Sequence, residues 1–270
     1  MKHNLSEYME FATRIAHEAG DIMLGYFNQS DITTIKDDNS LVTIADTAVN
    51  SYLIEQVKKY YPTHGILGEE ESHNPGSAIV WVCDPIDGTS NFSRGIPMFA
   101  FSLALMIDGA VVLAVAYDPI LKNLYTAIKG QGATKNGEKL ITKKRPLSDP
   151  RAYAGNANTA ASASFHAEMR KHLPTTRYNS YGAIVPELMQ VAEGGTVFWA
   201  DNFPWREKYF IDIAAAQLIV AEAGGRVTDF AGNEIPPRTA AVGFVASNDL
   251  VHDEVLRACQ RAQQKLEGGK

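Results

Sequence analysis

The sequence predicts an α/β fold, arranged as a layered αβαβα sandwich. Three observations predict it: two helical patterns open the chain, β-type segments joined by tight turns fill the centre, and strands alternate with helices over the remainder. An antiparallel sheet packed on paired helices, followed by a mixed or parallel sheet covered by helices, satisfies these patterns. We expect the two halves to be residues 1–145, with the main acidic site, and residues 146–270, with Asp212 and a substrate loop.

Two helices are predicted before the first sheet. Apolar residues recur at helical spacing over residues 5–27, and a second helix over residues 45–61 is stopped by Pro62. The polar stretch 36–40 between them is predicted to be a loop. Lys36 either reaches the functional site as part of a mobile flap or belongs to a plain solvated connection.

The strands of the first half are apolar, β-branched and separated by turn residues. Asp108-Gly109 and Asn136-Gly137 are typical hairpin turns. The predicted strands are residues 65–68, 78–83, 101–107, 110–117 and 124–128.

The second half alternates between strand and helix patterns, which favours a largely parallel or mixed sheet. Gly224-Gly225 ends the helix that Asp212 is expected to open. The predicted strands are residues 152–154, 175–179, 196–200 and 242–247, and the predicted helices are 162–172, 185–192, 212–222 and a last one from Leu250.

Composition limits the class of protein. With 270 residues and 45% hydrophobic content the chain can bury a large core, and its net charge of −6 argues against a nucleic-acid-binding surface. Cys83 and Cys259 are predicted to be buried and reduced. No apolar stretch has membrane-spanning length and no signal-peptide pattern opens the chain, so a cytoplasmic protein is expected.

The most informative stretch runs from Asp84 to Thr89. Asp84 and Asp87 stand where the preceding strand is expected to end, with Pro85 between them and Gly88-Thr89 at a predicted helix start. One such aspartate alone would be read as a turn, and Thr-Ser-Asn alone as a helix cap. The complete string instead predicts a site for a hard divalent cation beside an anion-binding helix start.

Two further acidic segments support this interpretation. Glu69, Glu70 and Glu71 follow the short strand pattern 65–68, which can direct one carboxylate towards a shared cation. Asp212 opens an apolar helix, where an acid can serve as a cap or first-turn residue as well as a metal ligand. The three segments together predict a metal site built from distant parts of the chain.

The string from Asp84 to Thr89 and the two further acidic segments resemble the inositol monophosphatase family, within the lithium-sensitive, magnesium-dependent phosphatases that include the fructose-1,6-bisphosphatases. The resemblance implies a fold like that of fructose-1,6-bisphosphatase. The resemblance covers about residues 5–260 and is carried by order and spacing. Its motifs are Gly68-Glu69-Glu70, Asp84-Pro85-Ile86-Asp87-Gly88-Thr89, Asp212 with Glu222-Ala223-Gly224-Gly225, and Lys36 followed by Leu41-Val42-Thr43-Ile44-Ala45-Asp46.

The resemblance implies a role for each motif residue. Two or three Mg2+ ions would be held by Glu69, Asp84, Asp87, Asp212 and the carbonyl of Ile86. Thr89, supported by Asp46, would orient the attacking water, and Glu69 would help to remove its proton. The substrate would contact Asp87, Gly88, Thr89, Asp201 and Asp212, with the backbone amides of Gly88 and Thr89 on the phosphate. We expect Asp87→Asn to abolish turnover and leave the fold intact.

The implied function is hydrolysis of a small phosphate monoester, with myo-inositol 1-phosphate as the default substrate. Fructose 1,6-bisphosphate, histidinol phosphate and 3′(2′),5′-bisphosphate nucleotides remain alternatives, as does a regulatory protein that retains the site but acts by binding a partner. The resemblance also implies Li+ sensitivity and a homodimer. No nucleic-acid or membrane partner is expected.

Departures from the family pattern lie where the leaving group of the substrate should bind. Ile211 stands where relatives commonly have Trp, and several residues are inserted between Asp201 and Phe210 relative to the family pattern. Asp201 maps most simply to the acid that binds a sugar hydroxyl. In the inserted stretch, Phe203 and Trp205 are expected to pack on the core, whereas Arg206 and Lys208 either face solvent or accept a second anionic group.

Overall fold

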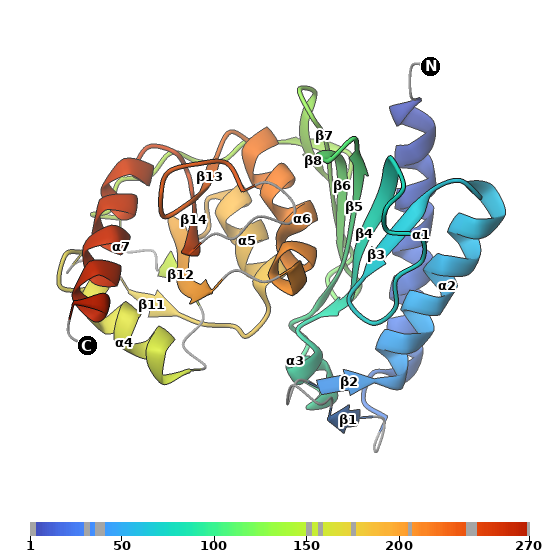
Figure 1. Ribbon diagram of the computed structural model, residues 1–270, viewed down its shortest axis with the longest axis horizontal. Coiled ribbons are helices and arrows are strands. Elements are labelled where there is room, and N and C mark those ends of the chain that lie inside the picture. Colours follow the sequence, from blue (N-terminus) through green and yellow to red (C-terminus); the bar gives the residue numbers. More distant parts are fainter. Residues whose placement is uncertain are drawn as a thin grey trace.

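Five layers succeed one another in the order helix, sheet, helix, sheet, helix, which confirms the predicted sandwich (Figure 1). The structure is a computed structural model. It describes residues 4–29, 33–35, 41–149, 153–155, 159–173, 177–204, 207–235 and 242–268.

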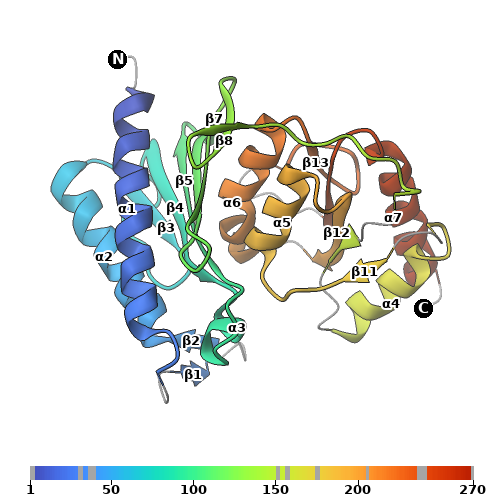
Figure 2. The same ribbon diagram turned by 180° about the vertical axis from the view of Figure 1, so that it is seen from behind.

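The first layer consists of two helices on the outer face of the larger sheet (Figure 2). Helix α1 (Leu5–Tyr26) buries a stripe that includes Phe11 and Ile15, as the helical spacing predicts. Helix α2 (Ile44–Tyr60) begins with a capping box, in which the side chains of Thr43 and Asp46 each accept a hydrogen bond from the other's backbone amide. The capping box fixes Asp46 at the helix start. A two-stranded ribbon, β1 (Thr33–Ile35) with β2 (Leu41–Thr43), precedes it.

The larger sheet has seven strands in the order β3-β4-β5-β6-β7-β8-β9. Its hairpins turn at Asp108-Gly109 and Asn136-Gly137, as predicted. The sheet is mixed, because β3 runs parallel to β4 while every other neighbouring pair is antiparallel. The strands are β3 (Gly65–Gly68), β4 (Ile79–Asp87), β5 (Ala100–Ile107), β6 (Ala110–Asp118), β7 (Asn123–Ile128), β8 (Gly132–Lys135) and β9 (Glu138–Leu140).

The prediction that Asp84 and Asp87 follow the end of a strand was wrong in one respect. Strand β4 continues through both residues, and its register against β5 shifts between them. Pro85 lies in this irregular stretch, where a missing backbone donor is tolerated because the regular ladder is interrupted. The bulge therefore redirects the backbone between the two carboxylates.

The third layer holds α5 (Ile184–Glu193) and α6 (Glu207–Glu222), which pack between the two sheets (Figure 1). Helix α6 begins before Asp212, so the prediction that this residue opens the helix was wrong: Asp212 lies in its second turn. The substrate loop predicted over residues 201–210 is regular structure where it is described, because residues 201–204 belong to a strand and residues 207–210 to α6. Trp205 and Arg206 lie outside the described residues, as does Lys36.

The smaller sheet has five strands in the order β11-β10-β12-β14-β13 and is covered on its outer face by two helices. Edge strand β13 was not predicted, because its sequence Arg-Val-Thr-Asp is too short and polar to be distinguished from a loop. The strands are β10 (Tyr153–Ala154), β11 (Tyr178–Asn179), β12 (Phe198–Pro204), β13 (Arg226–Asp229) and β14 (Val242–Ser247), and the helices are α4 (Ala160–Met169) and α7 (His252–Glu267).

One apolar cluster joins the two halves. It contains Val82 and Ala104 of the larger sheet, Leu188 of α5, Ile219 of α6 and Phe244 of the smaller sheet. Because these side chains are buried together, the position of the middle helices is fixed from both sides. Cys83 and Cys259 are free and buried, as predicted. None of the described helices combines the length and apolar character needed to cross a membrane.

Candidate active site

Three predicted carboxylates meet at the junction of the two halves. Glu69 directly follows β3, Asp84 lies on β4, and Asp212 lies on α6. Each offers one oxygen atom, and these three atoms lie within 4.8 Å of one another. Parallel pairing of β3 with β4 brings Glu69 beside Asp84, since Gly68 is in register with Cys83. The fold thus brings together carboxylates from Glu69 and Asp212, which are 143 positions apart in the sequence.

The cluster is electrostatically costly without a cation. Asp84 is 2% exposed, and burial raises its pKa well above the usual range, with further increases from Glu69, Asp212 and Asp87. Its Oδ1 accepts a hydrogen bond of 3.0 Å from the amide of Ile86, which keeps the carboxyl group in place. Converging oxygen ligands of this kind suit a hard divalent cation, whose charge would offset their mutual repulsion.

Asp87 lies beside this cluster but its two oxygens are bonded to the start of α5. Oδ1 accepts from the amide of Ile184 at 3.1 Å, and Oδ2 from that of Val185 at 2.8 Å. Burial raises the pKa of Asp87 to about 7; the two amides lower it, while Glu187 and Glu69 raise it. Asp87 is not one of the three residues whose oxygen atoms lie within 4.8 Å of one another. Its carboxylate instead caps helix α5, in the other half.

Helix α5 depends on this cap. Its N-cap residue, Ala183, has no side chain that can accept a hydrogen bond, and Pro186 in its first turn has no amide hydrogen to donate. The amides of Ile184 and Val185 have no acceptor within the helix, and both donate to Asp87.

Thr89 lies between two acceptors. Its Oγ1 is 3.0 Å from the carbonyl oxygen of Ile86 and 3.3 Å from Oδ1 of Asp46. A hydroxyl has one proton to donate, so its lone pairs remain available for another donor. Asp46 is fully buried, and burial raises its pKa to about 6; hydrogen bonds from Thr43 lower the value, while Glu70 and Glu69 raise it.

Gly88 forms the turn between β4 and the short helix α3 (Thr89–Ser93). Its φ of 92° lies in the left-handed region, and a Cβ at this position would approach Ala183 Cβ to 2.8 Å and the carbonyl oxygen of Met98 to 2.9 Å. A side chain is thus excluded both by conformation and by space. The backbone of the turn therefore packs directly on residue 183.

Asp201 has a different environment from the other predicted site residues. It is 1% exposed on β12, and its Oδ1 accepts from Ser162 Oγ of α4 at 2.9 Å and from the amide of Asn202 at 2.6 Å. The three-carboxylate set does not include it. Its predicted contact with a substrate hydroxyl stays a prediction.

Glu187, a buried carboxylate next to the site, was not predicted from the sequence. It lies on α5 and accepts hydrogen bonds from the amides of Tyr181 and Gly182 and from Nε1 of Trp199. Burial raises its pKa to about 7, against the lowering effect of these three donors. The signal in the sequence was an acid within the apolar run Val185-Pro186-Glu187-Leu188-Met189.

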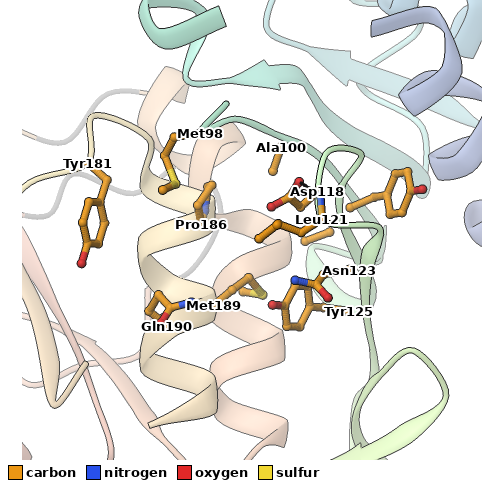
Figure 3. A pocket seen from close by; sticks show the side chains of 12 residues that line it. Met98, Ala100, Asp118, Leu121, Asn123, Tyr125, Tyr181, Pro186, Met189 and Gln190 are labelled. Atoms are coloured by element: carbon orange, nitrogen blue, oxygen red, sulfur yellow. Dashed lines mark hydrogen bonds between the residues drawn. The ribbon is translucent and has the colours of Figure 1, made fainter. Parts of the chain in front are cut away.

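A pocket of about 220 Å³ lies between α5 and the loop that joins β6 to β7 (Figure 3). Pro186, Met189 and Gln190 project from α5 into it, opposite Leu121 and Asn123. None of the predicted site residues lines this pocket.

Comparisons with known proteins agree with this arrangement. The family model described as "Inositol monophosphatase family" matches residues 4–265. A fructose-1,6-bisphosphatase/inositol-1-monophosphatase of Thermotoga maritima is 30% identical over 266 residues, covering 97% of this chain and 99% of that protein. The Nus factor SuhB of Pasteurella multocida is 34% identical over 247 residues, covering 84% and 87%.

Among solved structures, that of a Thermotoga maritima IMPase superposes with a TM-score of 0.85 at 28% identity, covering 96% of this chain and 99% of the other. The family match spans nearly the entire sequence, and the fold is shared over the same extent. The chain therefore belongs to the inositol monophosphatase family.

Proposed function

We propose that this protein is a Mg2+-dependent phosphatase that hydrolyses a small phosphate monoester, with myo-inositol 1-phosphate as the first substrate to test. The observation that carries the proposal is the convergence of Glu69, Asp84 and Asp212 within 4.8 Å. A buried acid such as Asp84, placed between two half-buried ones, is retained at a cost that a bound cation would offset. We further propose Li+ sensitivity, a homodimer and a cytoplasmic location, following the family resemblance.

Each proposed site residue would have its own role. Glu69, Asp84 and Asp212 would hold the cations, with Asp87 and the Ile86 carbonyl beside them. Bound Mg2+ would supply positive charge for the phosphoryl oxygens and a water of lowered pKa.

Thr89 would orient the attacking water. Its proton is donated to Asp46 or to the carbonyl of Ile86, so its oxygen can accept a hydrogen bond from that water. The amides of Gly88 and Thr89 would contact the phosphate. Asp201 is proposed to bind a substrate hydroxyl only if it exchanges its bond with Ser162, and Asp201→Ala tests this through the KM for polyol esters.

Release of inorganic phosphate, measured with Mg2+ and with EDTA, tests the proposal. The substrates are myo-inositol 1-phosphate, fructose 1,6-bisphosphate, histidinol phosphate and 3′-phosphoadenosine 5′-phosphate, compared by kcat/KM. We expect Mg2+-dependent hydrolysis with one ester preferred. Equal phosphate release in EDTA, or none from any ester, would contradict the proposal.

A regulatory role is the second candidate, since relatives 33–34% identical carry the name Nus factor SuhB. Complementation of a strain that lacks this protein separates the two roles. The Asp212→Asn variant should still complement if the protein acts as a regulator, and should fail to complement if it acts as a phosphatase.

A further inference from the structure

We propose that Glu187 is a positioning residue that sets residues 181–185 against the Gly88 turn and thereby shapes the side of the site that receives the leaving group. The inference rests on the proposed phosphatase function and deepens it. Glu187 is not one of the proposed cation ligands. It would act through the backbone segment that it holds.

Three N–H donors converge on Glu187 from two elements. Oε1 lies 2.5 Å from the amide nitrogen of Tyr181 and 3.2 Å from that of Gly182, and Oε2 lies 2.5 Å from Nε1 of Trp199 on β12. The side chain is buried, with only 2% of the residue exposed. A carboxylate is the side chain that accepts on both atoms, so it can satisfy donors arriving from opposite sides. Its contacts tie the segment to the smaller sheet.

The same segment contacts the Gly88 turn. Asn91 of α3 donates through Nδ2 to the carbonyl oxygen of Tyr181 at 2.7 Å. Residue 183 packs so closely on Gly88 that a Cβ there would lie 2.8 Å from Ala183 Cβ. Because the phosphate of an ester is proposed to sit on this turn, the group attached to that phosphate would meet residues 181–185.

Asp87 holds the other end of the segment. Its carboxylate accepts the amides of Ile184 and Val185, so four of the amides between residues 181 and 185 end on two buried carboxylates. The segment is thus fixed at one end by a proposed site residue and at the other by Glu187. Removing the second attachment releases the amides of Tyr181 and Gly182, while the bonds of Asp87 to the segment stay in place.

Glu187→Gln tests this attachment at constant size. The glutamine oxygen can accept from Tyr181 and Gly182 only if its NH2 group then faces the N–H of Trp199, which sets two donors against each other. Trp199→Phe removes that opposing donor. The double variant should therefore recover what the single glutamine variant loses, and Trp199→Phe alone is the matched control.

We expect Glu187→Gln to raise the KM of the preferred ester about tenfold and to change kcat less than about threefold. Inhibition by inorganic phosphate, which lacks a leaving group, should stay within about twofold of wild type. In Glu187→Gln with Trp199→Phe, the KM should return to within about threefold. A lowered melting temperature with an unchanged KM would overturn the proposal, because it would show a role in stability alone.

Hydrogen exchange provides a test that does not need turnover. The amides of Tyr181 and Gly182 should exchange about tenfold faster in Glu187→Gln than in wild type, whereas those of Ile184 and Val185, which Asp87 holds, should change less. The double variant should restore the protection of Tyr181 and Gly182. Unchanged exchange in Glu187→Gln would overturn the inference. Absence of hydrolysis in wild type, with the exchange result as expected, would instead contradict the phosphatase function and leave Glu187 as the holder of this segment.

Discussion

Asp87 and Glu187 lie 100 residues apart in the sequence and accept hydrogen bonds from the two ends of one backbone segment. Each carboxyl has its pKa raised to about 7, mainly by burial, and Glu187 contributes to the increase at Asp87. Two acids are thus kept in an unfavourable setting where they order the backbone next to the proposed phosphate-binding turn.

Asp87→Asn should reduce stability as well as activity, contrary to the expectation from sequence that the fold would be unaffected. Both oxygens of Asp87 accept an amide of α5, so the NH2 group of asparagine must face either Ile184 N–H or Val185 N–H. An unsatisfied buried donor costs about 1–3 kcal/mol. Urea denaturation measures this loss. Asp118→Asn is the control, because Oδ1 alone accepts both amides there and asparagine retains that atom.

Asp84→Asn should stabilise the metal-free protein while abolishing its response to Mg2+. Asparagine keeps the Oδ1 acceptor for the amide of Ile86 and removes an acid that burial and four neighbouring carboxylates disfavour. We expect a gain of at least about 1 kcal/mol in EDTA at neutral pH. Thermal unfolding with EDTA and with millimolar Mg2+ measures both effects. Stabilisation of wild type and variant by the same amount on adding Mg2+ would remove Asp84 from the cation site.

Thr89→Val should lower kcat by about a hundredfold or more, because valine has the shape of threonine without the hydroxyl that would orient water. Thr89→Ser keeps that hydroxyl near Ile86 and Asp46 and should retain activity within about tenfold. Steady-state kinetics on the preferred ester distinguish the two variants. Equal losses in both would indicate that the methyl group matters and the hydroxyl does not.

His252 should make the protein less stable in acid. Its two ring nitrogens lie 2.8 Å from Thr228 Oγ1 and 2.8 Å from Ser247 Oγ, and burial lowers its pKa from 6.5 to about 4. A lowered pKa stabilises the fold above pH 6.5, and this contribution is lost as pH falls from 6.5 towards 4, by up to about 1.4 kcal/mol per unit.

The measurement is urea denaturation of wild type and His252→Asn between pH 4 and 8. The stability difference between them should shrink as pH falls through that window, because asparagine does not titrate. His172→Asn, which removes an exposed histidine, is the control. A difference that is constant across the pH range would contradict this account of His252.

Much of the fold could be predicted because its signals are local. The spacing of Phe11 and Ile15 gave α1, and Asp108-Gly109 gave the β5–β6 hairpin. The parallel pairing of β3 with β4 depends on where the segment between them passes, and no local pattern specifies it. The start of α6 was misplaced because Glu207–Phe210 carry no cap residue or periodic break that separates them from a loop.

The residues of the candidate site could be predicted from the sequence, but their hydrogen-bond partners could not. The motifs predicted that Glu69, Asp84 and Asp212 share a site, and the three do converge. The bonds of Asp87 to α5 and of Asp201 to Ser162 could not be predicted, because they join segments whose distance in space follows only from packing. Glu187 was missed for the same reason: its donors lie in the segment before α5 and on strand β12.

The start of α5 has a consequence for the order of folding. The side chain of its N-cap residue, Ala183, cannot accept a hydrogen bond, so the first amides of this helix are capped instead by Asp87 of β4, in the other half. Its first turn can therefore be completed only after the strand that carries Asp87 is in place. During synthesis the ribosome releases that strand first. Reversing the order of the halves by circular permutation should accordingly slow the final folding step while leaving the finished structure unchanged.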